Sequence, residues 1–204
     1  MVVKAQHELD HPIDDPALPS FRMPILRELA EDLRRAYDTF HCLRGCKDRY
    51  LPQEAAEPDD AYKGRLSRST YADFFRSSIT AFSGVLSKFS LADPPATLEA
   101  AQGNIDYEGN SLTAWLQQAD GLMLRDGGVL LCVDMPAGVP GNAAEEVAQG
   151  RRPYLQARPR SKVLNWRVTM VDGIEELERC TVLELVEEPD GMFGTKEVPR
   201  YRVI

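Results

Sequence analysis

The clearest hydrophobic pattern in the chain predicts an amphipathic helix that begins just after Gly109. Asn110 and Ser111 suit the N-cap of this helix, and Gly127 or Gly128 can adopt the left-handed conformation that ends it. Between these ends, apolar side chains recur every three or four residues, which places them on one helical face. This face consists of Leu112, Trp115, Leu116, Ala119, Leu122 and Met123.

A strand is predicted directly after this helix. Val129 to Val133 are apolar without alternation, and Asp134 and Pro136 end the run. A strand that is apolar on both sides is usually covered on both faces. We therefore predict that the helix and the strand form the folding core of the protein. The predicted core residues are Leu112, Trp115, Leu116, Leu122, Leu131, Val133 and, further along the chain, Trp166.

Two more helices are predicted before this core. The first begins near Pro24, which suits the first helical turn, and stops around Gly45. The second runs from about Asp60 to Leu86 and has basic early turns. Residues 1–22 contain acids and prolines without a sustained period, so we predict an extended or mobile arm.

The character of the sequence changes after the central strand. Residues 137–152 are rich in Gly, Ala and Glu and are predicted to form an exposed loop. Four later segments favour strand (154–158, 163–168, 181–186 and 201–204), and Asp172-Gly173 and Asp190-Gly191 are turn signals. The pattern predicts an α+β fold, in which a helical front half packs on a mostly antiparallel, β-rich back half. We divide the chain into an arm (1–22), a helical region ending in the buried strand (23–136) and a β-rich region (137–204) that continues the same domain.

Composition and charge narrow the functional classes. The chain has 204 residues, of which 43% are hydrophobic and 27% charged, as in a folded protein with one substantial core. Its net charge of −8 disfavours a protein that binds nucleic acid through bulk electrostatic attraction. The longest purely apolar runs are too short to span a bilayer, so no membrane partner is predicted. Four cysteines without a framework spacing indicate reduced thiols in a cytoplasmic setting.

Catalytic and metal-binding patterns are weak. Asp134 ends a strand as a metal-binding aspartate of an NTPase would, but residues 191–196 (GMFGTK) do not have the spacing of a phosphate loop. All three histidines precede residue 42, which gives no support to a nucleophilic triad. A zinc site would have to draw on His7, His11, His41, Cys42 and Cys46, whose spacing is not that of a zinc knuckle. We predict no catalytic residue, no cofactor and no metal ion.

The most unusual chemical stretch is residues 151–167, which we call the basic block. It contains arginines and a lysine but no acids, and two aromatic residues, Tyr154 and Trp166, lie among them. Such a block suits a phosphate backbone. It equally suits the acidic residues between 172 and 190, either on a neighbouring subunit or in a hairpin of the same chain. We expect an acidic protein partner ahead of DNA. The candidate interface residues, which could alternatively face DNA, are Arg151, Arg152, Arg158, Arg160, Lys162 and Arg167.

The order of several short motifs resembles the N-terminal half of the portal protein family of tailed bacteriophages. The resemblance covers roughly residues 37–204, and each motif is weak without the others. The motifs are Tyr50-Leu51-Pro52, Asn104-Ile105-Asp106 with Gly109-Asn110-Ser111-Leu112, 127–136 (GGVLLCVDMP), Arg152-Pro153-Tyr154, 163–167 (VLNWR), 182–184 (VLE) and 200–204 (RYRVI).

This resemblance implies a structural virion protein with wing-like α+β architecture, made in the host cytoplasm. Portal subunits form a dodecameric ring at one capsid vertex, through which double-stranded DNA is packaged and ejected. The ring docks the terminase, and later the neck or adaptor proteins, and has no catalytic activity of its own. The resemblance also implies that this chain ends within an expected strand, at about half the usual subunit length, as a truncated portal or a short relative.

Two alternatives stay open on the sequence. One is a neck or adaptor-type interaction module, which would share the assembly but occupy a different position in it. The other is a small cytoplasmic enzyme with an unrecognised site. The oligomeric state in solution separates the two assembly proteins from the enzyme.

Overall fold

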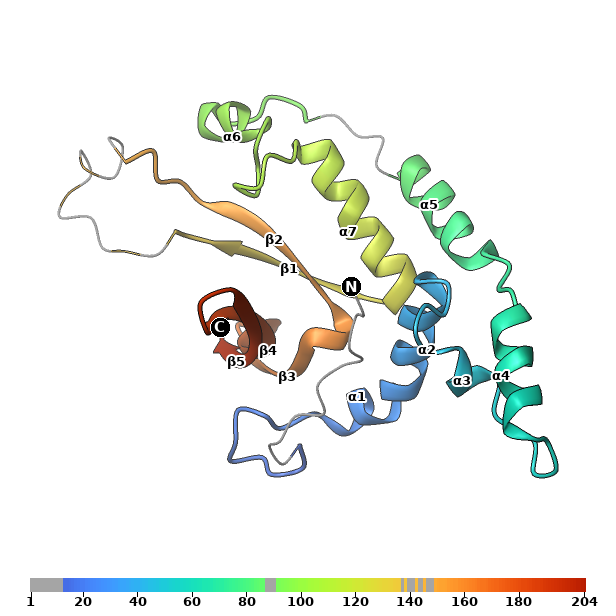
Figure 1. Ribbon diagram of the computed structural model, residues 1–204. Helices are drawn as coiled ribbons and strands as arrows, with labels where there is room; N and C mark the ends of the chain where they lie inside the picture. The colour runs from blue at the N-terminus through green and yellow to red at the C-terminus, as the bar shows by residue number, and fades with distance from the viewer. Residues whose placement is uncertain (1–12, 87–90, 137, 139–141, 143–144, 146–148) are drawn as a thin grey trace. The chain divides into compact units, whose positions relative to one another are not determined.

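The computed structural model describes residues 13–86, 91–136, 138, 142, 145 and 149–204 (Figure 1). These residues contain helices and two antiparallel sheets, which confirms the predicted α+β class. The chain divides into two compact units. The first unit comprises Met1–Ser78 and Ser161–Ile204, and the second comprises Ile79–Arg160.

The second unit is built around the predicted amphipathic helix, α7 (Leu112–Asp126). The Ser111 hydroxyl accepts a hydrogen bond from the Ala114 amide, and Gly127 ends the helix with φ = 68°. Both predicted caps are confirmed, because short polar side chains and glycine meet the needs of the two helix ends locally. The remaining elements are α6 (Ala96–Ala101), β1 (Val129–Asp134), β2 (Tyr154–Pro159) and the second part of α5 (Phe74–Leu86).

The core of the second unit lies between α6, α7 and β2. Its buried residues are Ala101, Ile105, Leu112 and Trp115, and Leu98, Leu116, Leu155 and Ala157 pack against them. Leu112, Trp115 and Leu116 are therefore core residues, as predicted. Leu122 is half-buried.

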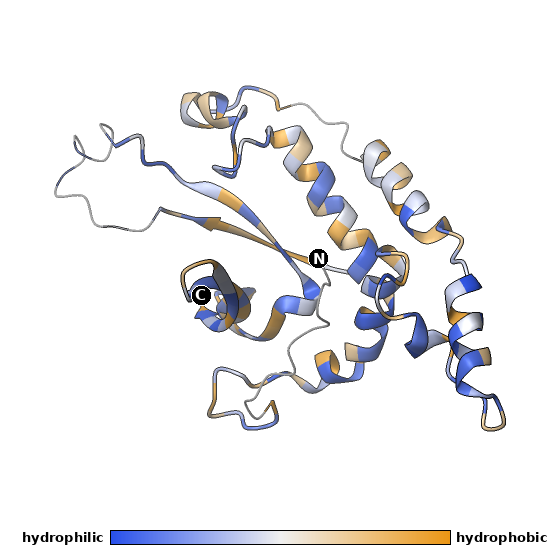
Figure 2. Ribbon diagram, viewed as in Figure 1, coloured by the Kyte–Doolittle hydropathy of each residue, from blue (hydrophilic) through white to orange (hydrophobic). Residues whose placement is uncertain are grey.

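The prediction that β1 is covered on both faces is wrong. Leu131 and Val133 are 52% and 71% exposed. The register pairs Leu131 with Ala157 and Val133 with Leu155 in a two-stranded sheet, and α7 runs alongside this hairpin (Figure 1). The core draws its strand residues from β2, so β1 forms an apolar edge, coloured orange along most of its length in Figure 2. A single helix does not cover both faces of such a hairpin.

A short loop between α6 and α7 is held by the buried carboxylate of Asp106. It accepts hydrogen bonds from the amides of Glu108 (2.9 Å) and Asn110 (3.2 Å) and from the Asn110 side chain (2.6 Å). Burial alone would raise the pKa of Asp106, but these hydrogen bonds lower it on balance. The loop also contacts the sheet of the second unit, where the Leu155 amide of β2 donates a hydrogen bond to the Ile105 carbonyl.

We predict that Asp106→Asn lowers the free energy of unfolding by about 1–2 kcal/mol at neutral pH, because charge-assisted hydrogen bonds become neutral ones. A carboxylate with a lowered folded-state pKa stabilises the protein above its ordinary pKa, and this stabilisation is lost as the pH falls through the folded-state value. The difference between wild type and variant should therefore shrink in acid. Urea unfolding at pH 7 and pH 3 measures it, and a difference that is equal at both pH values would contradict the prediction.

The first unit begins with a segment that packs on a strand. Ser20 is 2% exposed, the Met23 amide donates to the Leu164 carbonyl (3.0 Å), and the Asn165 side chain donates to the Phe21 carbonyl (2.8 Å). The predicted mobile arm over 1–22 is therefore wrong for residues 20–22. Residues 1–12 of that arm lie outside the described residues, as does most of the loop predicted over 137–152.

Both predicted front helices are interrupted. The first is α1 (Pro24–Glu28) followed by α2 (Ala30–Phe40), and it starts at Pro24 as predicted. The second is α4 (Asp59–Arg68) followed by α5, separated by an extended stretch that begins at Ser69. Here the Ser69 hydroxyl donates to the Arg65 carbonyl, and the Asp73 carboxylate accepts from the Arg76 amide. These local side-chain bonds end one helix and begin the next.

The sheet of the first unit consists of β3 (Val163–Val171), β4 (Ile174–Asp190) and β5 (Gly194–Val203) in sequential antiparallel order. Both predicted turns are confirmed: Asp172 and Gly173 have positive φ, and Gly191 opens the turn between β4 and β5. Val163, Leu164, Cys180 and Val182 are buried, whereas Trp166 is 36% exposed. Placing Trp166 in the core was therefore wrong, because β3 emerges from the buried region after Asn165.

Candidate interaction surfaces

The first two arginines of the basic block contact two different loops of the second unit, one after β1 and one between α6 and α7. The Arg151 guanidinium donates to the Pro136 carbonyl (2.7 Å). The Arg152 guanidinium donates to the Asn104 carbonyl and lies 4.3 Å from the centre of the Tyr107 ring. Both side chains therefore have structural partners in their own chain.

The next two arginines also contact their own chain. Arg158 donates to the Gln156 side chain two residues earlier on β2 (2.9 Å). Arg160 donates to the Gly127 carbonyl at the end of α7 (3.3 Å), where a positive charge suits the negative end of the helix dipole. Reversing these charges would alter the second unit itself, so such a variant cannot report on assembly alone.

Lys162 and Arg167 belong to the first unit. Burial lowers the pKa of Lys162, Glu197 acts in the opposite direction, and the charge of Arg22 lowers it further. Arg167 forms an exposed ion pair with Glu178 across the β3–β4 hairpin (3.0 Å). For Arg167 the structure thus has the within-chain pairing that the sequence left open. An interface role for the basic block stays a prediction.

The acidic run has further partners on the adjacent strand. Glu184 lies 3.6 Å from Arg202, and Glu188 lies 3.0 Å from Arg200. Both cross-strand pairs remain accessible to solvent and add little to stability, about 0–1 kcal/mol each. They nevertheless pair two of the acidic residues, which were expected to face another subunit, with arginines of the same chain.

An apolar surface lies on the same hairpin. Val168 pairs with Leu177 and Met170 with Glu175, and the alternation along β3 places Trp166 on that same face. The four apolar side chains that share this face, the ribbon stripe, are Trp166, Val168, Met170 and Leu177, which are 36%, 47%, 62% and 54% exposed. A continuous row of exposed apolar residues is typical of a surface that another protein covers.

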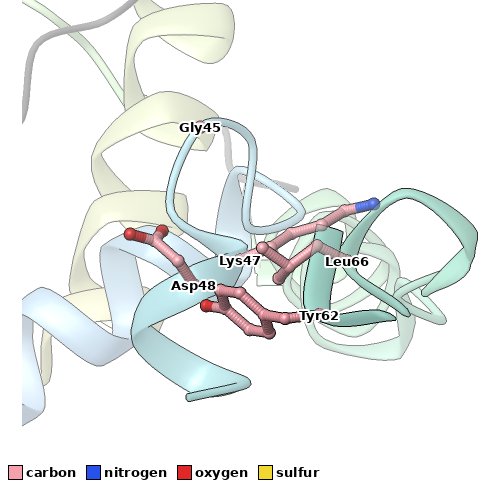
Figure 3. A pocket seen from close by; sticks show the side chains of 5 residues that line it. All are labelled: Gly45, Lys47, Asp48, Tyr62 and Leu66. Carbon is pink, nitrogen blue, oxygen red and sulfur yellow. The ribbon is translucent and has the colours of Figure 1, made fainter. Parts of the chain in front are cut away.

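A pocket of about 500 Å³ opens between α3 (Lys47–Tyr50) and α4. We call it the α3–α4 pocket; Gly45, Lys47, Asp48, Tyr62 and Leu66 line it. Figure 3 shows the Tyr62 ring and the Leu66 side chain close to the Lys47 stem, with the Lys47 ammonium and the Asp48 carboxylate directed to opposite sides. The sequence analysis did not identify this pocket, although the four-residue spacing of Tyr62 and Leu66 places them on one face of α4.

A polar cluster around the buried Asp38 carboxylate lies at the C-terminal end of α3. The Asp38 carboxylate, on α2, accepts hydrogen bonds from the Arg49 guanidinium and from the Tyr50 hydroxyl (2.8 Å). Burial, together with the hydrogen bond to Asp38, raises the pKa of Tyr50 to about 12. Tyr50 is therefore protonated at neutral pH and acts as a hydrogen-bond donor, which is a structural role.

The cysteines of this region are not activated nucleophiles. Burial raises the pKa of Cys42 and of Cys46, and the hydrogen bond from Cys42 to the Asp73 carboxylate acts in the same direction. A catalytic cysteine needs a lowered pKa, since the thiolate is the reactive form.

The described residues hold no group of three or more His, Cys, Asp or Glu side chains that could bind a metal ion. His7 and His11, two of the zinc candidates, lie outside the described residues. Asp134 accepts hydrogen bonds from the Met135 amide and the Tyr154 hydroxyl at the end of β1.

In the part of the chain that the structure describes, no helix has the length and apolar character needed to cross a membrane. No protein-family model and no curated protein matches the sequence.

Proposed function

We propose that this chain is a structural subunit of a ring of the portal type in a tailed bacteriophage. The ordered motifs from Tyr50 to Ile204 support the family, and the ribbon stripe is the observation that carries the assembly role. In the proposed ring the stripe is covered by protein, which removes four large apolar side chains from water. The ring surrounds double-stranded DNA at a capsid vertex and docks the terminase and then the neck proteins. The chain itself performs no catalysis.

Several polar side chains of the described region have structural roles. Asp106 holds a loop, Asp38 holds Arg49 and Tyr50, and the pKa of each cysteine in the α2–α3 region is raised. These features favour an assembly protein over a small enzyme. A neck or adaptor-type module is the second candidate, because the same apolar stripe would serve it equally well. Binding of the terminase by the assembled ring would favour the portal over the adaptor.

We predict that Val168→Glu with Met170→Glu prevents assembly and leaves a folded monomer. Both positions are on the ribbon stripe and about half or more exposed, so two carboxylates are tolerated in the free chain but not under a covering protein. Analytical ultracentrifugation and negative-stain electron microscopy measure the loss of rings.

Thr169→Glu with Val171→Glu is the matched control. It adds the same charge to the same strand on the opposite face. Each variant places one new carboxylate opposite an existing one on β4: position 170 faces Glu175 in the test variant, and position 169 faces Glu176 in the control. Rings that persist in the control and vanish in the test variant support the proposal. A wild-type protein that stays monomeric at all accessible concentrations would overturn it.

A further inference from the structure

The segment that leads into α1 is fixed against the start of β3. The Met23 amide donates to the Leu164 carbonyl (3.0 Å), and the Asn165 side chain donates to the Phe21 carbonyl (2.8 Å). Leu164 and Asn165 are both buried. The backbone on either side of Arg22 is therefore held by hydrogen bonds to buried strand residues.

Lys162 lies directly before the same strand, and its ammonium group is close to the Arg22 guanidinium. It is the last residue of a short 3₁₀ helix, η1 (Arg160–Lys162), and the next residue, Val163, is buried. The charge of Arg22 lowers the pKa of Lys162, as a like charge does when it lies nearby. Both side chains are half-buried. We call Arg22 and Lys162 the cation pair.

The cation pair is not neutralised by an ion pair among the residues that the structure describes. The Arg22 Nε atom is buried without a hydrogen-bond acceptor. Burial lowers the pKa of Arg22, and no described carboxylate acts to raise it. Glu197 raises the pKa of Lys162, but it is exposed on β5 and forms no ion pair with this lysine. Because partly buried charges without a partner are unfavourable, an anion bound here would stabilise the fold.

The chemistry of the cation pair suits an anion with several oxygens. A guanidinium presents a planar fork of N–H donors that matches two oxygens of one anion, and an ammonium adds a compact charge with three donors. A phosphate monoester carries about two negative charges at pH 7, so it balances both cations. A carboxylate or a nucleic-acid diester balances only one. The nearby Glu197 and the net charge of −8 also disfavour a DNA backbone.

We propose that Arg22 and Lys162 bind a phosphate dianion, either the free ion or the terminal phosphate of an ester. The backbone at both residues is already fixed, so little conformational freedom is lost when the ligand binds. The site does not depend on the proposed ring, because both residues belong to the first unit of a single chain. A monomer should therefore bind phosphate as well as an assembled subunit does.

The test compares two charge-removing variants of the full chain with two matched controls. Arg22→Gln and Lys162→Gln each remove one member of the cation pair and keep a polar side chain. Arg27→Gln and Lys196→Gln remove the same kinds of charge from exposed positions of the same unit. Circular dichroism verifies that every variant is folded.

Isothermal titration calorimetry with inorganic phosphate at pH 7 and constant ionic strength measures binding. We expect Arg22→Gln and Lys162→Gln each to bind phosphate at least tenfold more weakly than wild type, and both controls to bind it as wild type does. Urea unfolding gives a second readout, because saturating phosphate should stabilise wild type but not the two pair variants. Without phosphate the pair variants should be at least as stable as wild type, whereas loss of a purely structural side chain would lower stability.

Comparison ligands identify the source and the class of the anion. Tighter binding of inorganic phosphate than of glycerol phosphate identifies the free ion, and the reverse order identifies an ester; both orders support the site. Acetate that binds as tightly as phosphate would indicate a carboxylate site and overturn the proposal. Binding of duplex DNA without terminal phosphates that is lost in the pair variants, while phosphate does not bind, would assign the pair to nucleic acid and also overturn it. Equal weakening in the controls, or no phosphate binding at millimolar concentration, would overturn the site itself.

Discussion

Replacing Trp115 with alanine is expected to lower the free energy of unfolding by about 3–5 kcal/mol. Trp115 is 5% exposed and lies in the core of the second unit with Ala101, Ile105 and Leu112. The substitution removes the largest side chain of this cluster and leaves a cavity that α7, capped at both ends, cannot close by a small shift. Urea unfolding followed by far-ultraviolet circular dichroism measures the loss without depending on tryptophan fluorescence.

The chain contains two tryptophans, and the other one is the matched control. Trp166 is 36% exposed on the ribbon stripe, so Trp166→Ala should cost less than half as much in the monomer. Leu131→Asp should likewise have a small effect, about 1 kcal/mol or less, because Leu131 is 52% exposed on β1. Equal losses for the two tryptophan variants would contradict the placement of the core in the second unit.

The parts of the fold that depend on neighbouring residues were predictable from the sequence. Ser111, Gly127 and the apolar stripe between them specify α7, because caps and helical spacing act within a few residues. The turn at Asp172-Gly173 was equally predictable, since its positive φ values suit these two residues. The existence of the basic block was evident too, although what its side chains contact was not.

The parts that depend on distant segments were not predictable. The five-residue apolar run in β1 was expected to be covered on both faces, but how many elements cover a strand is decided by the whole fold. The break between α4 and α5 is different, because a local signal for it exists: Asp73 is a suitable helix N-cap. The apolar stripe from Tyr62 to Phe82 predicts one continuous helix instead, so the two signals conflict. Asp38 meets Arg49 and Tyr50 through a turn in which Cys42 and Leu43 have positive φ, and no sequence pattern predicts that turn.

The polar cluster around Asp38 is the second place where one substitution should have a large effect. The Asp38 side chain is 11% exposed and that of Arg49 is 31% exposed. Asp38→Ala leaves a partly buried guanidinium and a tyrosine hydroxyl without their acceptor. We expect the free energy of unfolding to fall by about 2–3 kcal/mol, less than for a fully buried ion pair because Arg49 reaches solvent.

Asp32→Ala is the matched control on the same helix. Asp32 is 70% exposed and lies 3.6 Å from Arg35, so its removal should change stability by no more than about 0.5 kcal/mol. Urea unfolding of both variants at pH 7 makes the comparison. Similar losses at the two positions would mean that the Asp38 cluster contributes no more than a surface ion pair.

The same cluster should make the protein sensitive to alkali in a way that depends on Tyr50. Burial and the hydrogen bond to Asp38 raise the pKa of Tyr50 from its ordinary value near 10 to about 12 in the folded state. The folded state therefore holds the phenolic proton more tightly than the unfolded state does, and the resulting stability is fully present below pH 10 and is lost as the pH rises to 12. Wild type should lose stability between pH 9 and pH 11 more steeply than Tyr50→Phe, which has no proton to release. Urea unfolding at both pH values tests this prediction, and Tyr37→Phe on α2 is the control variant. Equal losses of stability in wild type and in Tyr50→Phe would show that the Asp38–Tyr50 hydrogen bond does not hold the phenol in its protonated form.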